Sequence, residues 1–244
     1  MKRKNRTRFF RGFSAFLKLF IHSPKFIHTG DTEIKPGSLI LSNHVGTTAP
    51  LKLEFYLPHD FRFWGAHQMN EGLIPLYKYL SRVFYHEKKH WPLWLARLFC
   101  IIAAPVANLF YSGLNLISTY TDIRFKRTVS ESLDAISAGE SLIIFPEDSS
   151  SGYHDVLTGF HAGFATLAKI ALRRGHDLTL YPVYYRKADD TVIVGTSVLF
   201  SELWEKYGDT AAIAEEMCAR VNALRTVTES TGTADAEQSK QAVS

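Results

Sequence analysis

The strongest constraint on the fold of this chain is the alternation of short apolar runs with longer segments of helical periodicity. The short runs are rich in β-branched and aromatic residues and end in turn residues, so they predict strands. Strands that alternate with helices are typical of an α/β fold with a largely parallel sheet, whose functional site lies where strands end. The predicted strands are 38–42, 61–65, 141–145, 178–181 and 191–195. The predicted helices are 46–57, 73–84, 92–111, 124–138, 160–174 and 208–225.

The length of 244 residues suits a single domain with a well-buried core. We expect a basic amphipathic segment over 1–30, one α/β domain with helices flanking its sheet over 31–225, and a disordered tail over 226–244. The tail has almost no bulky apolar residue. Cysteine occurs only at positions 100 and 218, which favours a reducing compartment and argues against a disulfide framework.

The N-terminus combines positive charge with phenylalanine. Eight lysines and arginines precede the first acidic residue, six of them within the first eleven positions, and five phenylalanines lie between positions 9 and 20. Their helical spacing over 7–21 predicts a basic amphipathic helix lying in a membrane interface. Nucleic acid is the other usual partner of basic arms, but so many phenyl groups favour lipid, and we expect no nucleic acid. A helix docked on its own domain with a solvated basic face stays open. Lys18 interrupts the apolar run, which disfavours a signal peptide.

A second apolar stretch covers 91–117 and contains Pro105. Its uninterrupted core falls short of the roughly 20 residues that span a bilayer, so we expect one or two buried or interfacial helices, kinked or divided near the proline. A re-entrant segment stays possible.

Two strand ends carry candidate chemistry. Asn43 and His44 directly follow the apolar run 39–42, and imidazole is suited to removing a proton from an alcohol near neutral pH. Pro146 ends the strand at 141–145, so that Glu147 and Asp148 project from it. Taken singly, a histidine at a strand end is more often a loop residue or a hydrogen-bonded structural residue, and the second motif also reads as a solvated acidic turn.

Taken together, these segments resemble the phospholipid and glycerol acyltransferase family. The shared order is Asn43-His44, an arginine at 124 or 127, Phe145-Pro146-Glu147, a helix from Phe160 and the strand containing Pro182-Val183, over roughly residues 36–196. The resemblance implies an acyltransferase-type domain that moves an acyl group from acyl-CoA or acyl carrier protein to the hydroxyl of a lysophospholipid or glycerol-based acceptor. It makes His44 the general base beside Asn43. The implied substrate-binding residues are Phe145, Pro146, Glu147, Asp148, Ser149, Arg124 and Arg127.

The partners implied are a membrane lipid and an acyl-CoA or acyl carrier protein thioester, which is a co-substrate, so no cofactor is expected. The implied location is the cytoplasmic face of a membrane, as a peripheral or monotopic protein. No histidine spacing has the form of a metal site, and we expect no metal. The chain also has no glycine-rich phosphate loop and no Gly-x-Ser-x-Gly motif, which disfavours nucleotide hydrolases and serine esterases.

The chain departs from the family pattern in three places. Ala49 stands where the pattern has an aspartate that orients the histidine. Glu147, Asp148 or a backbone carbonyl are the candidate substitutes; Glu54 would lie about 140° round a helix from position 49. Asp148 and Ser150 replace a glycine and an arginine that the family associates with a phosphate-bearing acceptor. Finally, 69–116 looks like an insertion, either a lid or tunnel for the acyl chain or additional core.

Two alternatives to acyl transfer stay open. The first is a catalytically silent relative that binds acyl-CoA or lipid at the membrane surface, for which Ala49 and Ser150 are the best evidence. The second is a thioesterase, in which water replaces the alcohol.

Overall fold

The computed structural model describes residues 7–30, 33–147 and 154–228, and these fall into two compact units. The first unit draws on Met1–Ile21 and Arg62–Ser132, and the second on His22–Phe61 and Leu133–Ser244. This division groups the N-terminal helix with the 62–132 segment. Residues 229–244 of the expected tail lie outside the described residues.

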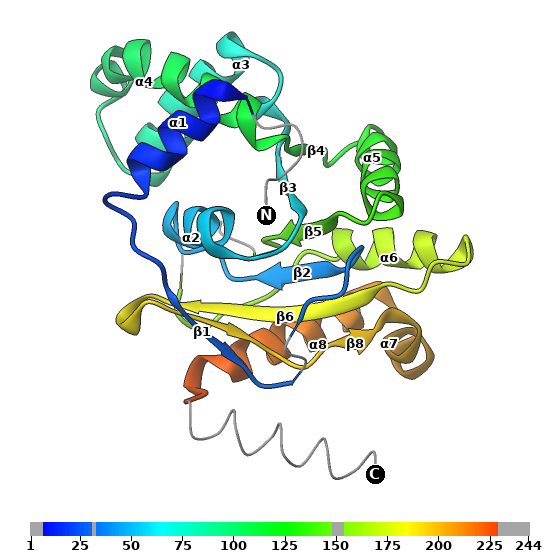
Figure 1. The fold of residues 1–244 in the computed structure, drawn as a ribbon. Coiled ribbons are helices and arrows are strands. Elements are labelled where there is room, and N and C mark those ends of the chain that lie inside the picture. The colour runs from blue at the N-terminus through cyan, green and yellow to red at the C-terminus, as the bar shows by residue number, and fades with distance from the viewer. Residues whose placement is uncertain (1–6, 31–32, 148–153, 229–244) are drawn as a thin grey trace. The chain divides into compact units, whose positions relative to one another are not determined.

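The second unit is built on a mixed, mostly parallel sheet (Figure 1). β2 pairs in parallel with β5 on one side and with β6 on the other; β7 runs antiparallel to β6 and parallel to β1, and the short β8 pairs antiparallel with β6. The predicted α/β class with a largely parallel sheet is confirmed. The strands are β1 (Lys25–His28), β2 (Leu39–Ser42), β5 (Ser141–Ile144), β6 (Thr179–Arg186), β7 (Thr191–Val194) and β8 (Val198–Leu199).

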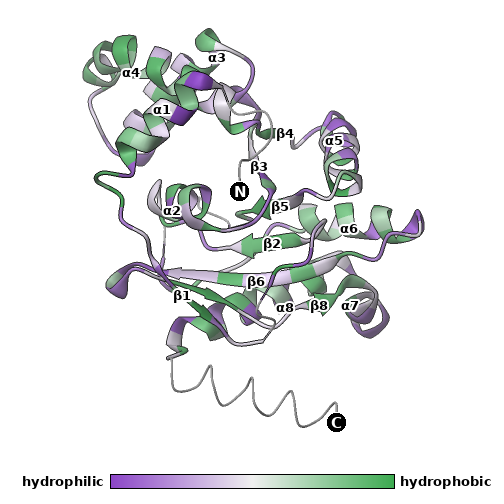
Figure 2. Cartoon of the chain, in the orientation of Figure 1, coloured by the Kyte–Doolittle hydropathy of each residue, from purple (hydrophilic) through white to green (hydrophobic). Residues whose placement is uncertain are grey.

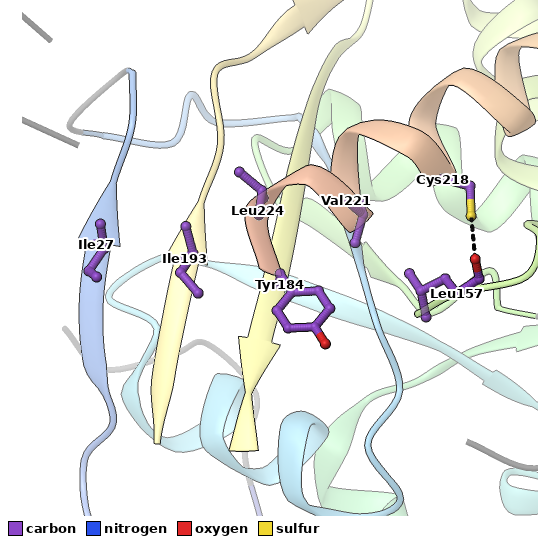
Figure 3. Packing of buried hydrophobic residues seen from close by; sticks show 7 residues of the cluster. All are labelled: Ile27, Leu157, Tyr184, Ile193, Cys218, Val221 and Leu224. Carbon is purple, nitrogen blue, oxygen red and sulfur yellow. Dashed lines mark hydrogen bonds between the residues drawn. The ribbon is translucent and has the colours of Figure 1, made fainter. Parts of the chain in front are cut away.

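Helices cover this sheet and form its core with it. α8 packs on β6 and β2, and α6 and α7 pack against α8. Figure 3 shows one cluster of this core, in which Val221 and Leu224 lie over Tyr184 of β6 and Ile193 of β7. The helices of the unit are α2 (Thr48–Tyr56), α6 (Gly163–Arg173), α7 (Phe200–Tyr207) and α8 (Thr210–Ala223), with 3-10 turns η3 (Lys187–Asp189) and η4 (Leu224–Thr226).

β6 runs without a break through Pro182, although the predicted strand ends at residue 181. The residue keeps its register with Leu41 of β2, and its carbonyl accepts a hydrogen bond of 2.8 Å from the N–H of Gly195. A Cβ on Gly195 would lie 2.9 Å from Cγ of Pro182. Glycine at the end of β7 therefore leaves room for the proline ring inside a central strand.

The first unit consists mainly of helices. Two short strands, β3 (Phe61–Ala66) and β4 (Ile117–Thr119), pair in parallel, and α5 (Phe125–Ser137) leads the chain on into the second unit. The segment expected to be an insertion builds a core of its own from Leu76, Leu80, Cys100 and Ala104. The other elements are α1 (Arg8–Leu17), η1 (His67–Met69), α3 (Leu73–Lys78), the π-helix η2 (Tyr79–Lys88) and α4 (Leu93–Leu114).

α4 is a single helix of 22 residues that continues through Pro105. Of the two alternatives drawn from the sequence, one helix is therefore the one observed. The expectation that the apolar core is too short to span a bilayer is corrected, because α4 is long and apolar enough to do so by length and composition. Only 17% of its most apolar window is buried.

α1 packs against α4 through one side only. Phe10 is buried, and its ring lies 5.1 Å from that of Phe110 on α4. Thr7 caps the helix by accepting a hydrogen bond of 3.1 Å from the N–H of Phe10. Phe9 and Phe16 stay exposed. The alternative of a helix docked on its own unit thus holds for one face, while a second apolar face remains on the surface.

Candidate active site at the ends of two parallel strands

The two candidate motifs meet at one edge of the sheet in the second unit. β2 and β5 are parallel neighbours, with Leu41 in register with Ile144. Because the strands run the same way, the residues that follow them emerge side by side. Asn43-His44 and Phe145-Pro146-Glu147, separated by a hundred residues of sequence, therefore share one edge.

Asn43 is held firmly against β6. The residue is only 2% exposed, and its side-chain amide nitrogen donates to the carbonyl of Tyr185 at 3.0 Å. Its amide oxygen accepts from the N–H of the same residue at 2.7 Å. The side chain thus satisfies both backbone groups of Tyr185, as a paired strand residue would. Asn43 consequently fixes the point at which the chain leaves the sheet.

A tight turn follows Asn43. Gly46 has a φ of 57° and donates its N–H to the carbonyl of His44 at 3.1 Å. A residue with a side chain would be strained in this left-handed conformation. The turn leads directly into α2, so the imidazole lies between a strand end and a helix start.

The carboxylate of Glu147 contacts the backbone of that turn. Its Oε2 accepts a hydrogen bond of 3.0 Å from the N–H of His44. Glu147 is 8% exposed, and burial raises the pKa of its carboxyl, although hydrogen bonds from the backbone N–H groups of His44 and His154 act to lower that pKa. Of the two turn carboxylates considered as substitutes for the missing aspartate, Glu147 thus binds main chain, and Asp148 lies outside the described residues, as does Ser149.

The imidazole of His44 packs edge-on against Phe145, with the ring centres 4.8 Å apart and the planes at 72°. Its Nδ1 is a buried atom, while the residue as a whole is partly exposed. Ala49 is fully buried in the first turn of α2. The imidazole of His44 thus contacts an aromatic ring, and its Nδ1 edge faces the protein interior.

Pro146 and Phe160 complete the edge. The carbonyl of Pro146 accepts from the N–H of His161 at 2.8 Å, and Glu147 forms an antiparallel bridge with Phe160. The start of the predicted helix near 160 therefore belongs to this edge, and α6 itself begins at Gly163.

The two arginines of the resemblance belong to the first unit. Arg124 is clamped by Asp122 through contacts of 2.9–3.1 Å and lies over the ring of Tyr120 at 4.4 Å. The hydrogen bonds from Arg124 lower the pKa of the Asp122 carboxyl. Arg127 donates to Glu131 at 2.9 Å. Each guanidinium thus already has a carboxylate partner within its own unit.

Sequence reasoning missed Tyr185, Lys52 and Asp190, which line the back of the His44 turn through contacts described below. For Tyr185 the sequence offered one signal, its position shortly after the Pro182-Val183 pair of the resemblance. Across residues 7–30, 33–147 and 154–228, no group of three or more histidine, cysteine, aspartate or glutamate side chains is placed to hold a metal ion.

No family model matches the chain, and no curated protein matches it. Among solved structures it is similar to the 1-acyl-sn-glycerophosphate (LPA) acyltransferase PlsC from Thermotoga maritima. The two chains are 13% identical, the match covers 88% of this chain and 78% of that one, and the TM-score is 0.45.

Proposed function

We propose that this protein is a lipid O-acyltransferase that works at a membrane surface. The observation that carries the proposal is the meeting of Asn43-His44 with Phe145-Pro146-Glu147 at one edge of the sheet, with a hydrogen bond of 3.0 Å between Glu147 and the backbone of His44. These are the segments on which the family resemblance rests, and their neighbouring positions at the sheet edge support a shared site.

In the proposed reaction, His44 acts as the general base. Nε2 would be the reacting nitrogen, since Nδ1 is buried. The imidazole takes the proton of the acceptor hydroxyl as its oxygen attacks the thioester carbonyl. The carbon–sulfur bond then breaks, and the imidazolium returns the proton to the departing thiolate. Proton transfer of this kind contributes about 10²–10⁴ in rate.

Asn43 and Glu147 support this histidine rather than react. Asn43 has both ends of its amide bound to Tyr185, and Glu147 holds the N–H of His44. We therefore assign both residues to positioning. The resemblance implies that Glu147 also helps to place the acceptor. To do so, its carboxylate would have to contact the acceptor while it keeps the hydrogen bond to the N–H of His44.

The proposed partner is a lipid surface, and the supporting observation is the apolar exterior of the first unit. Figure 2 shows hydrophobic residues along most of α4 and a mixture of hydrophobic and hydrophilic residues on α1. Ile102 is 75% exposed, and the basic residues Arg8 and Arg11 lie on α1 beside exposed Phe9. Apolar side chains flanked by cations suit an anionic membrane. The proposed location is the cytoplasmic face, with acyl-CoA or acyl carrier protein as the donor.

The second candidate is a catalytically silent relative that binds acyl-CoA or lipid. The observation that favours it is Ala49, which is fully buried where the resemblance places an orienting aspartate. In serine hydrolases, loss of the corresponding aspartate costs about 10⁴ in turnover.

The test is acyl transfer by the purified full-length protein in mixed micelles. Acyl-CoA and acyl carrier protein thioesters are offered with lysophospholipid and glycerol-based acceptors, and the products are identified by mass spectrometry. We expect an acylated lipid whose formation is lost in His44→Ala and kept in His176→Ala, a change at an exposed histidine after α6. Activity that survives His44→Ala would exclude the mechanism; free fatty acid as product would indicate a thioesterase.

A further inference from the structure

Asn43 and Lys52, which lie on the two sides of the His44 turn, are connected to each other through Tyr185 and Asp190. Asn43, just before the turn, is bound to the backbone of Tyr185 at 2.7 and 3.0 Å. Lys52, on α2 just after it, donates to Oδ2 of Asp190 at 2.7 Å, and Oδ1 of that aspartate accepts from the Tyr185 hydroxyl at 2.9 Å. The contacts form a closed ring around residues 44–51.

Lys52 is buried and fully engaged in this ring of contacts. Lys52 has a side chain only 8% exposed, and it also donates to the carbonyl of His22 at 2.6 Å. Buried lysine is costly unless it is paired and hydrogen-bonded, and here it is both. Lys52 follows Ala49 by three residues, so both lie on the buried face of α2.

Asp190 and Tyr185 are equally constrained. Asp190 has a φ of 52° and a ψ of 49°, and its carbonyl accepts from the N–H of Lys25 on β1 at 2.9 Å. Aspartate tolerates this left-handed conformation better than most residues. Tyr185 is 3% exposed, and burial followed by the bond to Asp190 raises the pKa of its phenol. Its hydroxyl therefore stays a neutral donor over the physiological range.

We propose that Lys52, Asp190 and Tyr185 are positioning residues that set the place of the His44 imidazole. The ring fixes both ends of the segment that carries the histidine, one at the strand and one at the helix. In an enzyme that lacks the usual carboxylate at position 49, these contacts hold the imidazole in place through the backbone of residues 43–52 instead. The catalytic part of this inference rests on the proposed acyl transfer, whereas the positioning part does not.

The experiment measures the imidazole directly. Full-length protein labelled with ¹⁵N-histidine is studied by long-range ¹H–¹⁵N correlation in detergent micelles, and His44 is identified among the ten histidines as the signal absent from His44→Ala. The test variants are Lys52→Met and Tyr185→Phe. The control is Asp189→Asn, which breaks a 2.7 Å ion pair with Arg186 in the same turn but leaves the ring intact.

We expect the His44 signal to shift or broaden in both test variants and to stay in place in the control. In the acyl transfer assay kcat should fall on the order of 10- to 100-fold, as misplaced catalytic groups usually cause, with the KM values of both substrates largely kept. A merely structural pair would lower the melting temperature and leave the signal of the folded fraction unchanged.

The outcomes separate the two proposals. An unchanged His44 signal in the folded variants overturns the positioning inference, whatever the activity. A moved signal in a protein without acyl transfer upholds the positioning inference and removes the proposed function. If Lys52→Met does not fold, as circular dichroism would show, Tyr185→Phe decides, because it removes one oxygen atom and leaves the bond between Lys52 and Asp190.

Discussion

At the residue scale, the question raised by Ala49 has a physical answer in its surroundings. The methyl group is fully buried on the inner face of α2, and the neighbouring support comes from Lys52 one turn on and from Glu147 on the adjacent strand end. A site of this kind holds its histidine by the backbone. A carboxylate introduced at position 49 would therefore be buried, and the histidine would not need it for its orientation.

We predict that Ala49→Asp destabilises the protein and does not raise its activity. Placing a polar group at a buried position without a prepared partner costs roughly 1–3 kcal/mol. Urea unfolding and acyl transfer measure the two effects, and Ala49→Asn separates the volume of the side chain from its charge. A large gain in acyl transfer from a near-zero baseline would instead identify a silent relative whose site still accepts the aspartate.

A second residue-scale prediction concerns Glu147. Burial raises the pKa of its carboxyl, so between about pH 4.5 and that raised value the folded state binds more protons than the unfolded state. The free energy of unfolding contributed by this group therefore falls as pH rises through that window. Glu147→Gln keeps an oxygen acceptor for the N–H of His44 and removes this pH dependence.

We expect the stability of Glu147→Gln relative to the wild type to increase as the pH rises from about 4.5 through the raised pKa, measured by urea unfolding at each pH. Glu205→Gln, at an exposed position on α7, controls for the change in net charge. A wild-type advantage that grows with pH would show that the ionised carboxylate is favoured in the folded state, contrary to the direction given by burial.

At the element scale, the contact between α1 and α4 depends on one glycine. A Cβ built on Gly113 would lie 2.3 Å from Cβ of Phe10, far closer than two carbon atoms can approach. The neighbouring ring of Phe110 lies 5.1 Å from that of Phe10. Glycine near the end of α4 is thus what allows the N-terminal helix to dock.

We predict that Gly113→Ala weakens or releases α1, although alanine is the better helix former by about 1 kcal/mol. Limited proteolysis near residue 20 and hydrogen exchange of α1 measure the release. Gly12→Ala is a matched control, because a Cβ there meets nothing within 4 Å and should stabilise α1 slightly. Undisturbed exchange of α1 in Gly113→Ala would contradict the prediction.

At the scale of the whole molecule, exposed apolar side chains gather on the helices of the first unit. Trp94 is 69% exposed and Ile102 75%, both on α4, and Phe20 just beyond α1 is 68% exposed. Soluble monomers rarely leave so much contiguous apolar surface uncovered. The proposed lipid partner would cover it.

We predict that the protein binds anionic vesicles more tightly than neutral ones, and that added salt weakens the difference, because the basic residues of α1 are screened. Ile102→Asn should weaken binding on the order of 10-fold or more, as expected for an isoleucine transferred from lipid to water. Ile123→Asn, at an 82% exposed position outside α1 and α4, is the control. Vesicle co-sedimentation measures both, and equal losses in the two variants would refute a specific apolar face.

The sequence by itself determined the class of fold and the two chemical motifs. The short apolar runs at 39–42 and 141–144 and the helical period between them are local properties, which the chain carries wherever it folds. Asn43-His44 and Phe145-Pro146-Glu147 were recognisable for the same reason. The short strands β1, β4 and β8 and the helix α7 were not predicted, because pairing and packing with distant residues stabilise such short elements.

Only the tertiary structure decided what holds the histidine. The parallel pairing of β2 with β5 brings Glu147 to the backbone of His44, and the pairing of β2 with β6 brings Tyr185 to Asn43. Lys52 and Asp190 meet across 138 residues of sequence. Contacts of this range leave no periodic trace in a single sequence, since their cause is the register between strands and not the spacing of residues along the chain.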